Sequence, residues 1–188
     1  MVKSKNFPKD LPEDPAYVNY KGVWDMQDLY ESMIDFFMRR KYKFAEKIYK
    51  HKHPSPFGVE QQHTWEFWRN ENDYIQIKYQ IYIHVYDLHD IEVITPEGEK
   101  KVYSKGRMYM EVKATVIPDY EGRWDENNFY SHLKDFYNKY VIRKNYTQGF
   151  SPKTRYEMHE FVAMVRNKLK MEADEYEHRH FGGVHKRY

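Results

Sequence analysis

The chain has 188 residues, enough for one domain with a buried core, and its 31 basic and 29 acidic residues leave a formal charge of +2. Such a balance excludes a protein that coats nucleic acid by bulk positive charge, so any basic surface must be local. The absence of cysteine excludes disulfides, thiolate zinc sites and a cysteine nucleophile. The 19 tyrosines suit broad surfaces, because each combines an apolar ring with a polar end.

The N-terminal stretch carries Pro8, Pro12 and Pro15 among charged residues. Because a proline disfavours helix at the residue before it, residues 1–20 are predicted to form an extended N-terminal arm. They lack the apolar core of a signal peptide, and no uncharged run approaches the roughly 18 residues that span a bilayer. We therefore expect a soluble, cytoplasmic protein, with one domain at 21–171 and a charged, histidine-rich tail at 172–188.

Residues 24–40 have apolar side chains at helical spacing, with Asp25 as a candidate N-cap and basic residues at the end. This pattern predicts a helix that packs its apolar stripe on a sheet. The segments that follow are interpreted as a strand, a loop, a second strand and a turn, at residues 42–52, 53–58, 59–69 and 70–73.

A long hairpin is the best-supported element of the sequence. Residues 74–93 and 102–117 both alternate between apolar and polar side chains, which is the pattern of strands with one buried face. Pro96 and Gly98 between them suit a short hairpin loop. A straight strand over residues 74–93 would exceed about 60 Å, so we expect a bend or bulge at residues 87–90, where polar residues enter the buried phase.

Two helices are predicted after the sheet. Asp125 can cap a helix that runs to about Arg143, and Ser151 with Pro152 suits the start of a second helix. The first has an apolar stripe that we expect to be buried, made of Phe129, Leu133, Phe136, Tyr137 and Tyr140. The fold class predicted is therefore α+β: a bent four-stranded antiparallel meander with one helix before it and two after, packed mainly on one face.

This order of elements, together with WDMQDLYESMIDFF, HKHPSPFG and FYSHLKDFYNKYV, resembles a group of uncharacterised small archaeal proteins. The resemblance covers roughly residues 20–145. It implies no activity, because no functional residues of that group can be carried over to this chain.

Catalytic chemistry has little support in the sequence. No nucleophile-and-base pattern and no glycine-rich phosphate loop is present, so we predict that the chain is not an enzyme in isolation, and no cofactor is expected. Asp87, His89 and Asp90 form the best acid–base cluster, although the same residues suit a strand bulge. The histidines, including His51 and His53, match no metal motif, and we assign no metal site.

The polar side of the hairpin combines aromatic rings with cations and is the predicted binding site. Its residues are Tyr74, Lys78, Tyr82, His84, Tyr86, Lys105, Arg107, Tyr109 and Lys113. Such a face suits a protein partner or self-association first, and single-stranded nucleic acid second, since bases stack on rings while phosphates pair with cations. The sequence thus predicts a non-catalytic binding or structural protein. The alternative is a helix-grip-like small-molecule or lipid binder with a pocket lined by Tyr79, Met108 and Met110.

Overall fold

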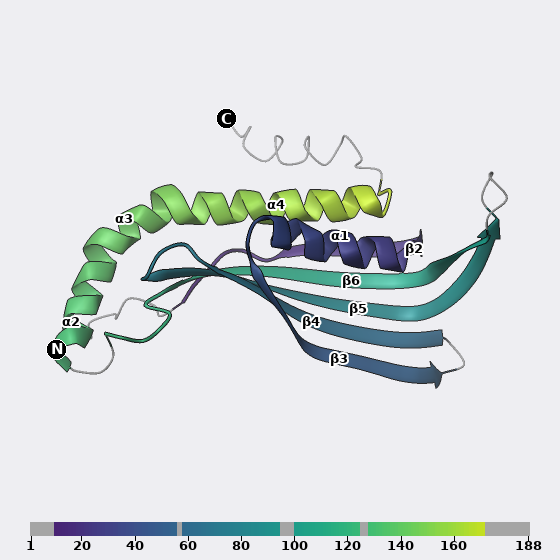
Figure 1. Cartoon of the computed structure of the whole chain (residues 1–188), viewed down its shortest axis with the longest axis horizontal. Coiled ribbons are helices and arrows are strands. Elements are labelled where there is room, and N and C mark those ends of the chain that lie inside the picture. The colour runs from purple at the N-terminus through teal and green to yellow at the C-terminus, as the bar shows by residue number, and fades with distance from the viewer. Residues whose placement is uncertain (1–9, 56–57, 95–99, 125–127, 172–188) are drawn as a thin grey trace, which may run out of the picture.

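The computed structural model describes residues 10–55, 58–94, 100–124 and 128–171 (Figure 1). Three predicted features lie outside these residues: the tip of the long hairpin at 95–99, the proposed helix cap Asp125, and the tail at 172–188. The same holds for the first nine residues of the predicted arm. No helix of the described residues is long and apolar enough to cross a membrane.

The fold is α+β, as predicted, and its sheet is antiparallel throughout the described pairings. The strand order is β1-β6-β5-β4-β3, and β2 pairs with the same edge of β6 as β1. The strands are β1 (Leu11–Pro12), β2 (Ala16–Trp24), β3 (Lys43–Ser55), β4 (Gly58–Asn70), β5 (Ile75–Ile94) and β6 (Lys100–Pro118). The prediction of four strands is wrong, because the described residues form a sheet of six.

The two additional strands come from the stretch that was expected to be an arm. β2 begins directly after Pro15 and pairs with β6 along its whole length, from Ala16 opposite Val112 to Trp24 opposite Ser104. β1 contains Pro12, which is tolerated because an edge strand leaves one side of its backbone unpaired. The prolines therefore exclude helix here, but they do not prevent edge strands.

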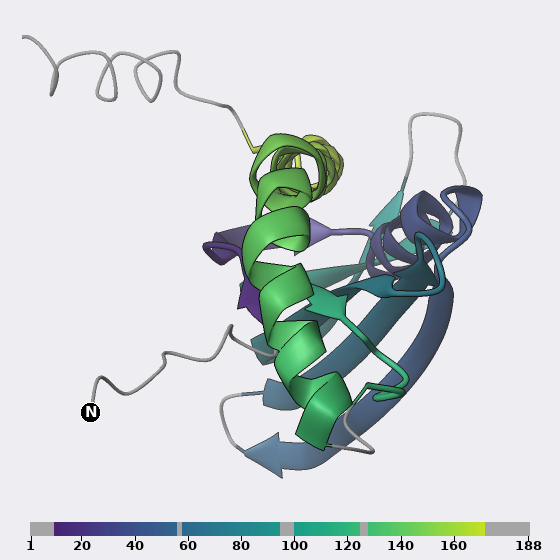
Figure 2. The same ribbon diagram turned by 90° about the vertical axis from the view of Figure 1, so that its left-hand side faces the viewer.

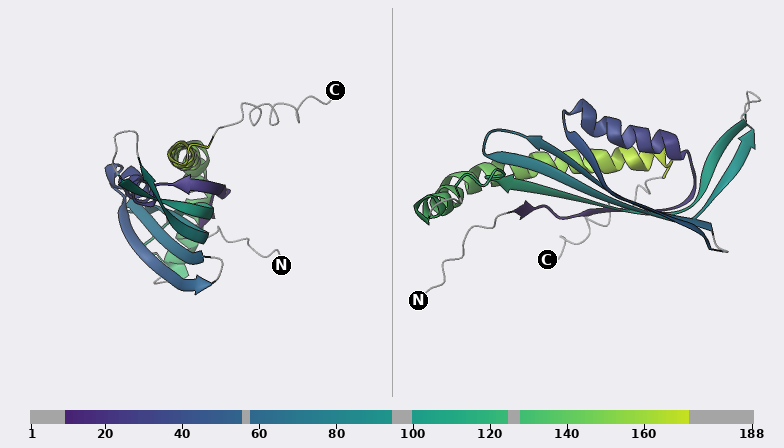
Figure 3. Two further views of the ribbon diagram at one scale, coloured as in Figure 1. Left: turned by 90° about the vertical axis from the view of Figure 1, so that its right-hand side faces the viewer. Right: turned by 60° about the horizontal axis from the view of Figure 1, so that its bottom comes forward.

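β5 and β6 form the long hairpin, and the bend predicted near residues 87–90 is confirmed. The register shifts between Tyr86 and His89, and Asp87 has a φ of 53°, as expected for an extra residue in one strand. Gly106 of β6 lies against this bulge, where a Cβ would come within 2.8 Å of the Tyr86 carbonyl oxygen. Beyond the bulge the hairpin turns away from the rest of the sheet (Figure 3).

Helices α1 (Met26–Arg39) and α4 (Ser151–Lys168) cover one face of the sheet (Figure 1). Asp25 caps α1 as predicted, since its side chain accepts a hydrogen bond from the Asp28 amide at 3.0 Å. Phe37 of α1 is fully buried, with its ring centroid 4.3 Å from that of Phe67 and 4.9 Å from that of Phe161. The apolar side chains of β5 complete this core, from Ile75 to Val85 at alternate positions.

The predicted pair of helices after the sheet is one continuous helical run. It consists of α2 (Asn128–Tyr137), η1 (Asn138–Ile142), α3 (Arg143–Asn145), η2 (Tyr146–Phe150) and α4, where η marks π-helical turns. Ser151 is therefore not an N-cap, because Phe150 before it is already helical. A π-helical turn changes the hydrogen-bond pattern directly before Pro152, which lets a residue without an N–H enter the run.

Candidate binding surface

The sheet face opposite α1 and α4, here called the outer face, carries most of the predicted site. Strand alternation directs Tyr82, His84 and Tyr86 away from the buried Ile81, Ile83 and Val85. The pairing of β5 with β6 then brings Tyr109 beside His84 and Arg107 beside Tyr86. Lys78 and Lys113 lie further along the same face, and Lys105 lies past the bulge.

Tyr74 is the predicted site residue that the structure separates from the others. Its ring packs against Trp124 and Tyr137, with centroids 5.8 and 5.4 Å away, and its hydroxyl donates to Asn138 Oδ1 at 2.7 Å. Burial raises the pKa of Tyr74 to about 12. This tyrosine therefore anchors the helical run to the end of the sheet and is not part of the outer face.

Five rings form a continuous aromatic row across three strands of the outer face: Tyr17, Tyr109, Tyr82, His84 and Tyr86. Successive centroids in this order are 6.3, 6.3, 6.0 and 3.7 Å apart. Tyr17 lies on β2 and was missed, because residues 1–20 were interpreted as an arm. The alternation of Tyr17, Asn19 and Lys21 with buried Val18 was the signal that could have revealed this strand.

Most of the predicted cations are paired with carboxylates on the same face. The ion pairs, with their N···O distances, join Lys78 to Glu66 (3.0 Å), Lys113 to Glu111 (3.0 Å) and Arg107 Nη2 to Asp87 (2.5 Å). Among the described residues, Lys105 has no carboxylate partner, and neither does Lys21 of β2. The surface around the aromatic row is thus close to neutral, with its unpaired cations near the bulge.

His84 is held in place within the row. Its Nε2 lies 2.5 Å from Glu60 Oε1, and its Nδ1 lies 3.3 Å from the Tyr82 hydroxyl. A proton on Nε2 satisfies both contacts, since Tyr82 can then donate to Nδ1. Hydrogen bonds from His84, then from Gln62 and Lys52, keep the pKa of Glu60 below its ordinary value, so this carboxylate is charged at neutral pH.

Two adjoining hollows of about 390 and 480 Å³ lie at the β2–β6 side of the row and share Lys21 and Arg107. Tyr86 and Tyr109 line the first hollow, and His89 lines the second, next to the bulge. The outer face is therefore not flat. Rings and basic side chains border a depression that a partner side chain or a base could enter.

The cluster of Asp87, His89 and Asp90 is divided by the bulge. Asp87 accepts hydrogen bonds from Arg107 Nε and Nη2 at 2.9 and 2.5 Å, and Asp90 is paired with Ser104 across the hairpin. No hydrogen bond between Asp87 and His89 occurs in the part of the chain that the structure describes. That part also contains no group of three or more His, Cys, Asp or Glu placed to hold a metal ion.

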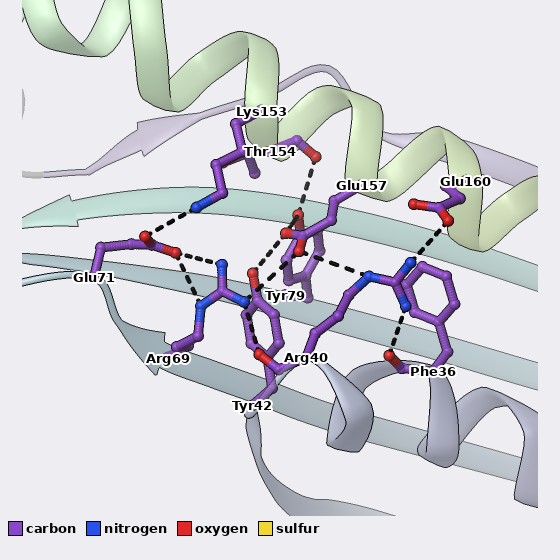
Figure 4. Close-up of polar contacts among 10 residues, drawn as sticks. All are labelled: Phe36, Arg40, Tyr42, Arg69, Glu71, Tyr79, Lys153, Thr154, Glu157 and Glu160. Carbon is purple, nitrogen blue, oxygen red and sulfur yellow. Dashed lines mark hydrogen bonds and ion pairs between the residues drawn. The ribbon is translucent and has the colours of Figure 1, made fainter.

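A second polar cluster lies on the helix side of the sheet, and the sequence did not reveal it (Figure 4). Glu157 of α4 accepts hydrogen bonds from the Tyr42 hydroxyl at 2.7 Å and the Tyr79 hydroxyl at 3.1 Å. Its other oxygen lies 3.8 Å from Arg40 Nε and 3.7 Å from Arg69 Nη1. These five residues, here called the Glu157 network, join α4 to the end of α1, to the residue directly before β3, and to the strands β4 and β5.

The Glu157 network is a connection between elements rather than a reactive group. Burial, reinforced by the negative charge of Glu157, raises the pKa of both Tyr42 and Tyr79. Both hydroxyls therefore stay protonated and act as donors. Arg69 adds a hydrogen bond from Nη1 to the Arg40 carbonyl oxygen at 2.7 Å, which ties the end of α1 to β4. The network also contacts its surroundings: the Tyr79 hydroxyl donates to the Thr154 carbonyl oxygen at 3.0 Å, and Arg40 Nη2 lies 2.8 Å from Glu160.

Comparison with models of known protein families finds no match, and comparison with curated protein sequences finds none either.

Proposed function

We propose that this chain is a binding protein and that the outer face, centred on the aromatic row, is the contact surface for another protein. The observation that supports this proposal is the continuity of five rings over three strands, with Tyr17 47% and Tyr86 37% exposed. Solubility requires only polar residues at such positions. Tyrosine and arginine are the residue types enriched at protein interfaces, where they act as anchors.

The ion pairs of the outer face also favour a protein partner. Lys78, Arg107 and Lys113 each have a carboxylate beside them, so their charge is largely neutralised before any partner arrives. A mixed, paired set of charges suits the polar rim of a protein interface. An anionic polymer would instead be repelled by the same carboxylates, which weakens the electrostatic attraction that nucleic acid binding requires.

Single-stranded nucleic acid is the second candidate, and one observation favours it. Lys21 and Lys105 have no acidic partner among the described residues and border the hollows beside Tyr86 and Tyr109. Rings next to unpaired cations are the combination that stacks bases and pairs phosphates. The two candidates differ in salt dependence, because only nucleic acid binding releases condensed counterions.

The alternative of a small-molecule or lipid pocket between sheet and helices has less support. Tyr79 and Met110, two of the side chains expected to line it, have no exposed surface. Tyr79 packs against Phe37 and Tyr42, with centroids 5.1 and 5.5 Å away, so aromatic rings occupy the space around it. A ligand retained in native mass spectrometry of the purified chain would revive this alternative.

The test is the double substitution Tyr82→Ser with Tyr109→Ser, which interrupts the aromatic row at its centre. We expect the thermal midpoint to change little and partner binding to weaken strongly, by about 2 kcal/mol for each anchoring ring. Affinity enrichment from cells that express the protein, quantified by mass spectrometry and repeated with the purified partner, measures this loss. Tyr156→Ser is the matched control, because Tyr156 is 76% exposed on α4, away from the row.

Two arms of the same experiment separate the candidates. Binding to a labelled oligonucleotide of about 20 nucleotides that weakens steeply between about 50 and about 200 mM salt would favour nucleic acid over protein. Enrichment that is equal for the wild type and the double variant would contradict the outer face as the contact surface. Unfolding of the double variant would show instead that these rings stabilise the sheet.

A further inference from the structure

The helical segment α2–η1 exposes its apolar side. Phe129, Leu133, Phe136 and Tyr140, here called the helical stripe, are 69%, 40%, 60% and 60% exposed. The prediction that the apolar stripe of this helix is buried is wrong for these four residues, whereas Tyr137 of the predicted stripe packs against Tyr74. Figure 2, which views the molecule from this end, shows the segment in front of the sheet, so that its outward side faces away from the core.

Polar contacts on the inward side determine which way the segment faces. Lys134 and Asn138 are buried, with Lys134 Nζ 2.8 Å from Asp119 Oδ2 and Asn138 Oδ1 accepting from the Tyr74 hydroxyl at 2.7 Å. Asp119 is itself buried, at 5% exposed, and turns its backbone with a φ of 51°. Rotation of the helix to bury the stripe would leave this acid–base pair without partners, which is costly inside a protein. The stripe is therefore held facing outward.

We propose that the helical stripe binds the same stripe of a second copy of this chain, so that two α2–η1 segments pack antiparallel about a two-fold axis. The stripe residues follow one another at intervals of four, three and four positions. This alternation of four and three positions is the spacing that keeps apolar residues at the seam between two paired helices. The spacing persists into the π-helical turn, since the Phe136 and Tyr140 rings remain 4.8 Å apart.

The charges near the segment select the antiparallel arrangement. Lys139, Arg143 and Lys144 are exposed at its C-terminal end, with Asp135 the acidic residue of α2 nearest to them in sequence. A parallel pair would bring the two basic ends together, whereas an antiparallel pair places them at opposite ends and also opposes the helix dipoles. A two-fold axis between Leu133 and Phe136 then sets Phe129 of one copy beside Tyr140 of the other.

The exposed area matches a reversible dimer. Aromatic side chains have about 150–250 Å² each, so the exposed fractions of the stripe and of its neighbour Tyr130 amount to about 500 Å² per copy. Two copies would bury about 1,000 Å², which is the lower end of the range for specific protein interfaces. We therefore expect an association that depends on concentration. It uses the end of the molecule and is independent of the outer face.

Sedimentation equilibrium of the full chain from about 1 to about 300 µM tests the proposal, a range suited to interfaces of this size. We expect the wild type to shift from monomer to dimer over this range. Phe136→Glu should stay monomeric at every concentration, because it places a charge at the centre of the seam. The control Tyr156→Ser removes an exposed aromatic residue of α4 and should dimerise like the wild type.

Disulfide cross-linking tests the orientation of the two paired helices. Because the chain has no native cysteine, only the introduced cysteines can form a disulfide. His132 and Lys139 are both exposed and flank the stripe on the same side, so in an antiparallel pair each lies next to the other residue of the partner. A mixture of H132C and K139C chains should form the mixed disulfide far faster than either variant forms its own.

The outcomes of these two experiments distinguish the proposed dimer from the alternatives. A wild type that stays monomeric, or a dimer that Phe136→Glu leaves intact, overturns the proposal. So does a monomeric chain that sediments with anionic lipid vesicles through the same stripe, because the occupant would then be a membrane surface. Rapid disulfide formation by each cysteine variant alone would overturn the antiparallel arrangement. The double variant of the aromatic row should dimerise normally, so failure here leaves the proposed function standing.

Discussion

Glu157 is a largely buried carboxylate that connects several elements. Its side chain is 12% exposed, yet it accepts hydrogen bonds from Tyr42 and Tyr79 and faces Arg40 and Arg69. A carboxylate at such a site is stabilised only while its partners are in place, and the partners depend equally on the carboxylate. The four partners come from the end of α1, from the residue directly before β3, and from β4 and β5, so one side chain of α4 links four other segments.

Replacement of Glu157 by alanine should therefore cost more than the loss of one surface ion pair. We expect Glu157→Ala to lower the free energy of unfolding by about 3–5 kcal/mol, because it removes the acceptor of the buried Tyr42 hydroxyl and leaves two guanidinium groups with less compensation. Urea denaturation followed by circular dichroism measures the change. Glu160→Ala is the control, since Glu160 is 62% exposed and pairs with Arg40 at the surface, where about 1 kcal/mol or less is at stake. Equal effects of the two substitutions would contradict the role assigned to the network.

β2 is the element whose contribution differs most from the sequence-based expectation. It covers one edge of β6, and Val18 at its centre is 1% exposed, opposite Met110. Asn19, the next residue, points to the outer face beside Tyr109 and is exposed. The strand thus contributes to both faces of the sheet, with Val18 in the core and Tyr17 in the aromatic row.

Substitution of neighbouring residues of β2 should separate these two faces. We expect Val18→Asp to lower the free energy of unfolding by about 3 kcal/mol or more, because it buries a charge without a partner. Asn19→Asp should change it by about 0.5 kcal/mol or less, as surface substitutions usually do. Thermal and urea denaturation of the two variants provide the measurement. If residues 16–24 were an arm that does not pack on the sheet, both variants would behave like the wild type.

At the scale of the whole molecule, carboxylates join segments that are far apart in the chain. Burial opposes ionisation of Glu13, but hydrogen bonds from Ser151, Tyr146 and Arg155 together outweigh it and lower the pKa of this carboxyl. Glu71 follows the same pattern: burial is outweighed by Lys153 and Arg69, and its pKa is also lowered. Both residues connect the sheet region to the helical run.

These lowered pKa values predict that the fold is destabilised by acid. A carboxyl whose pKa is lower in the folded chain contributes stability above its unfolded pKa, about 4.3 for glutamate, and loses it as the pH falls through the folded value. We therefore expect the urea midpoint to drop as the pH is lowered from about 5 to about 2. Glu13→Gln should be less stable at neutral pH and should show a shallower drop. A variant that is parallel to the wild type over this whole range would show that Glu13 does not contribute.

The sequence by itself determined the features that depend on short-range patterns. Alternation with one apolar side specified the long hairpin and its buried face, the polar residues at 87–90 marked the bulge, and Asp25 marked the start of α1. These signals are local, because a strand period or a cap is set by residues within a few positions of one another. Eight of the nine predicted site residues follow from the alternation and lie where it places them.

Only the tertiary structure decided which side of each helix or strand is buried. The apolar stripe of α2 has the sequence pattern of a buried surface. However, Lys134 pairs with Asp119 and Asn138 with Tyr74, which lie 15 and 64 positions away in the chain. These contacts hold the opposite side of the helix against the sheet, so the stripe faces outward. Tyr17 joins the aromatic row because β2 pairs with β6, some 90 residues later. The periodicity of the sequence indicates that a helix or strand has an apolar side and a polar side. Which side is buried depends on partners that are distant in sequence, and those are established only when the chain folds.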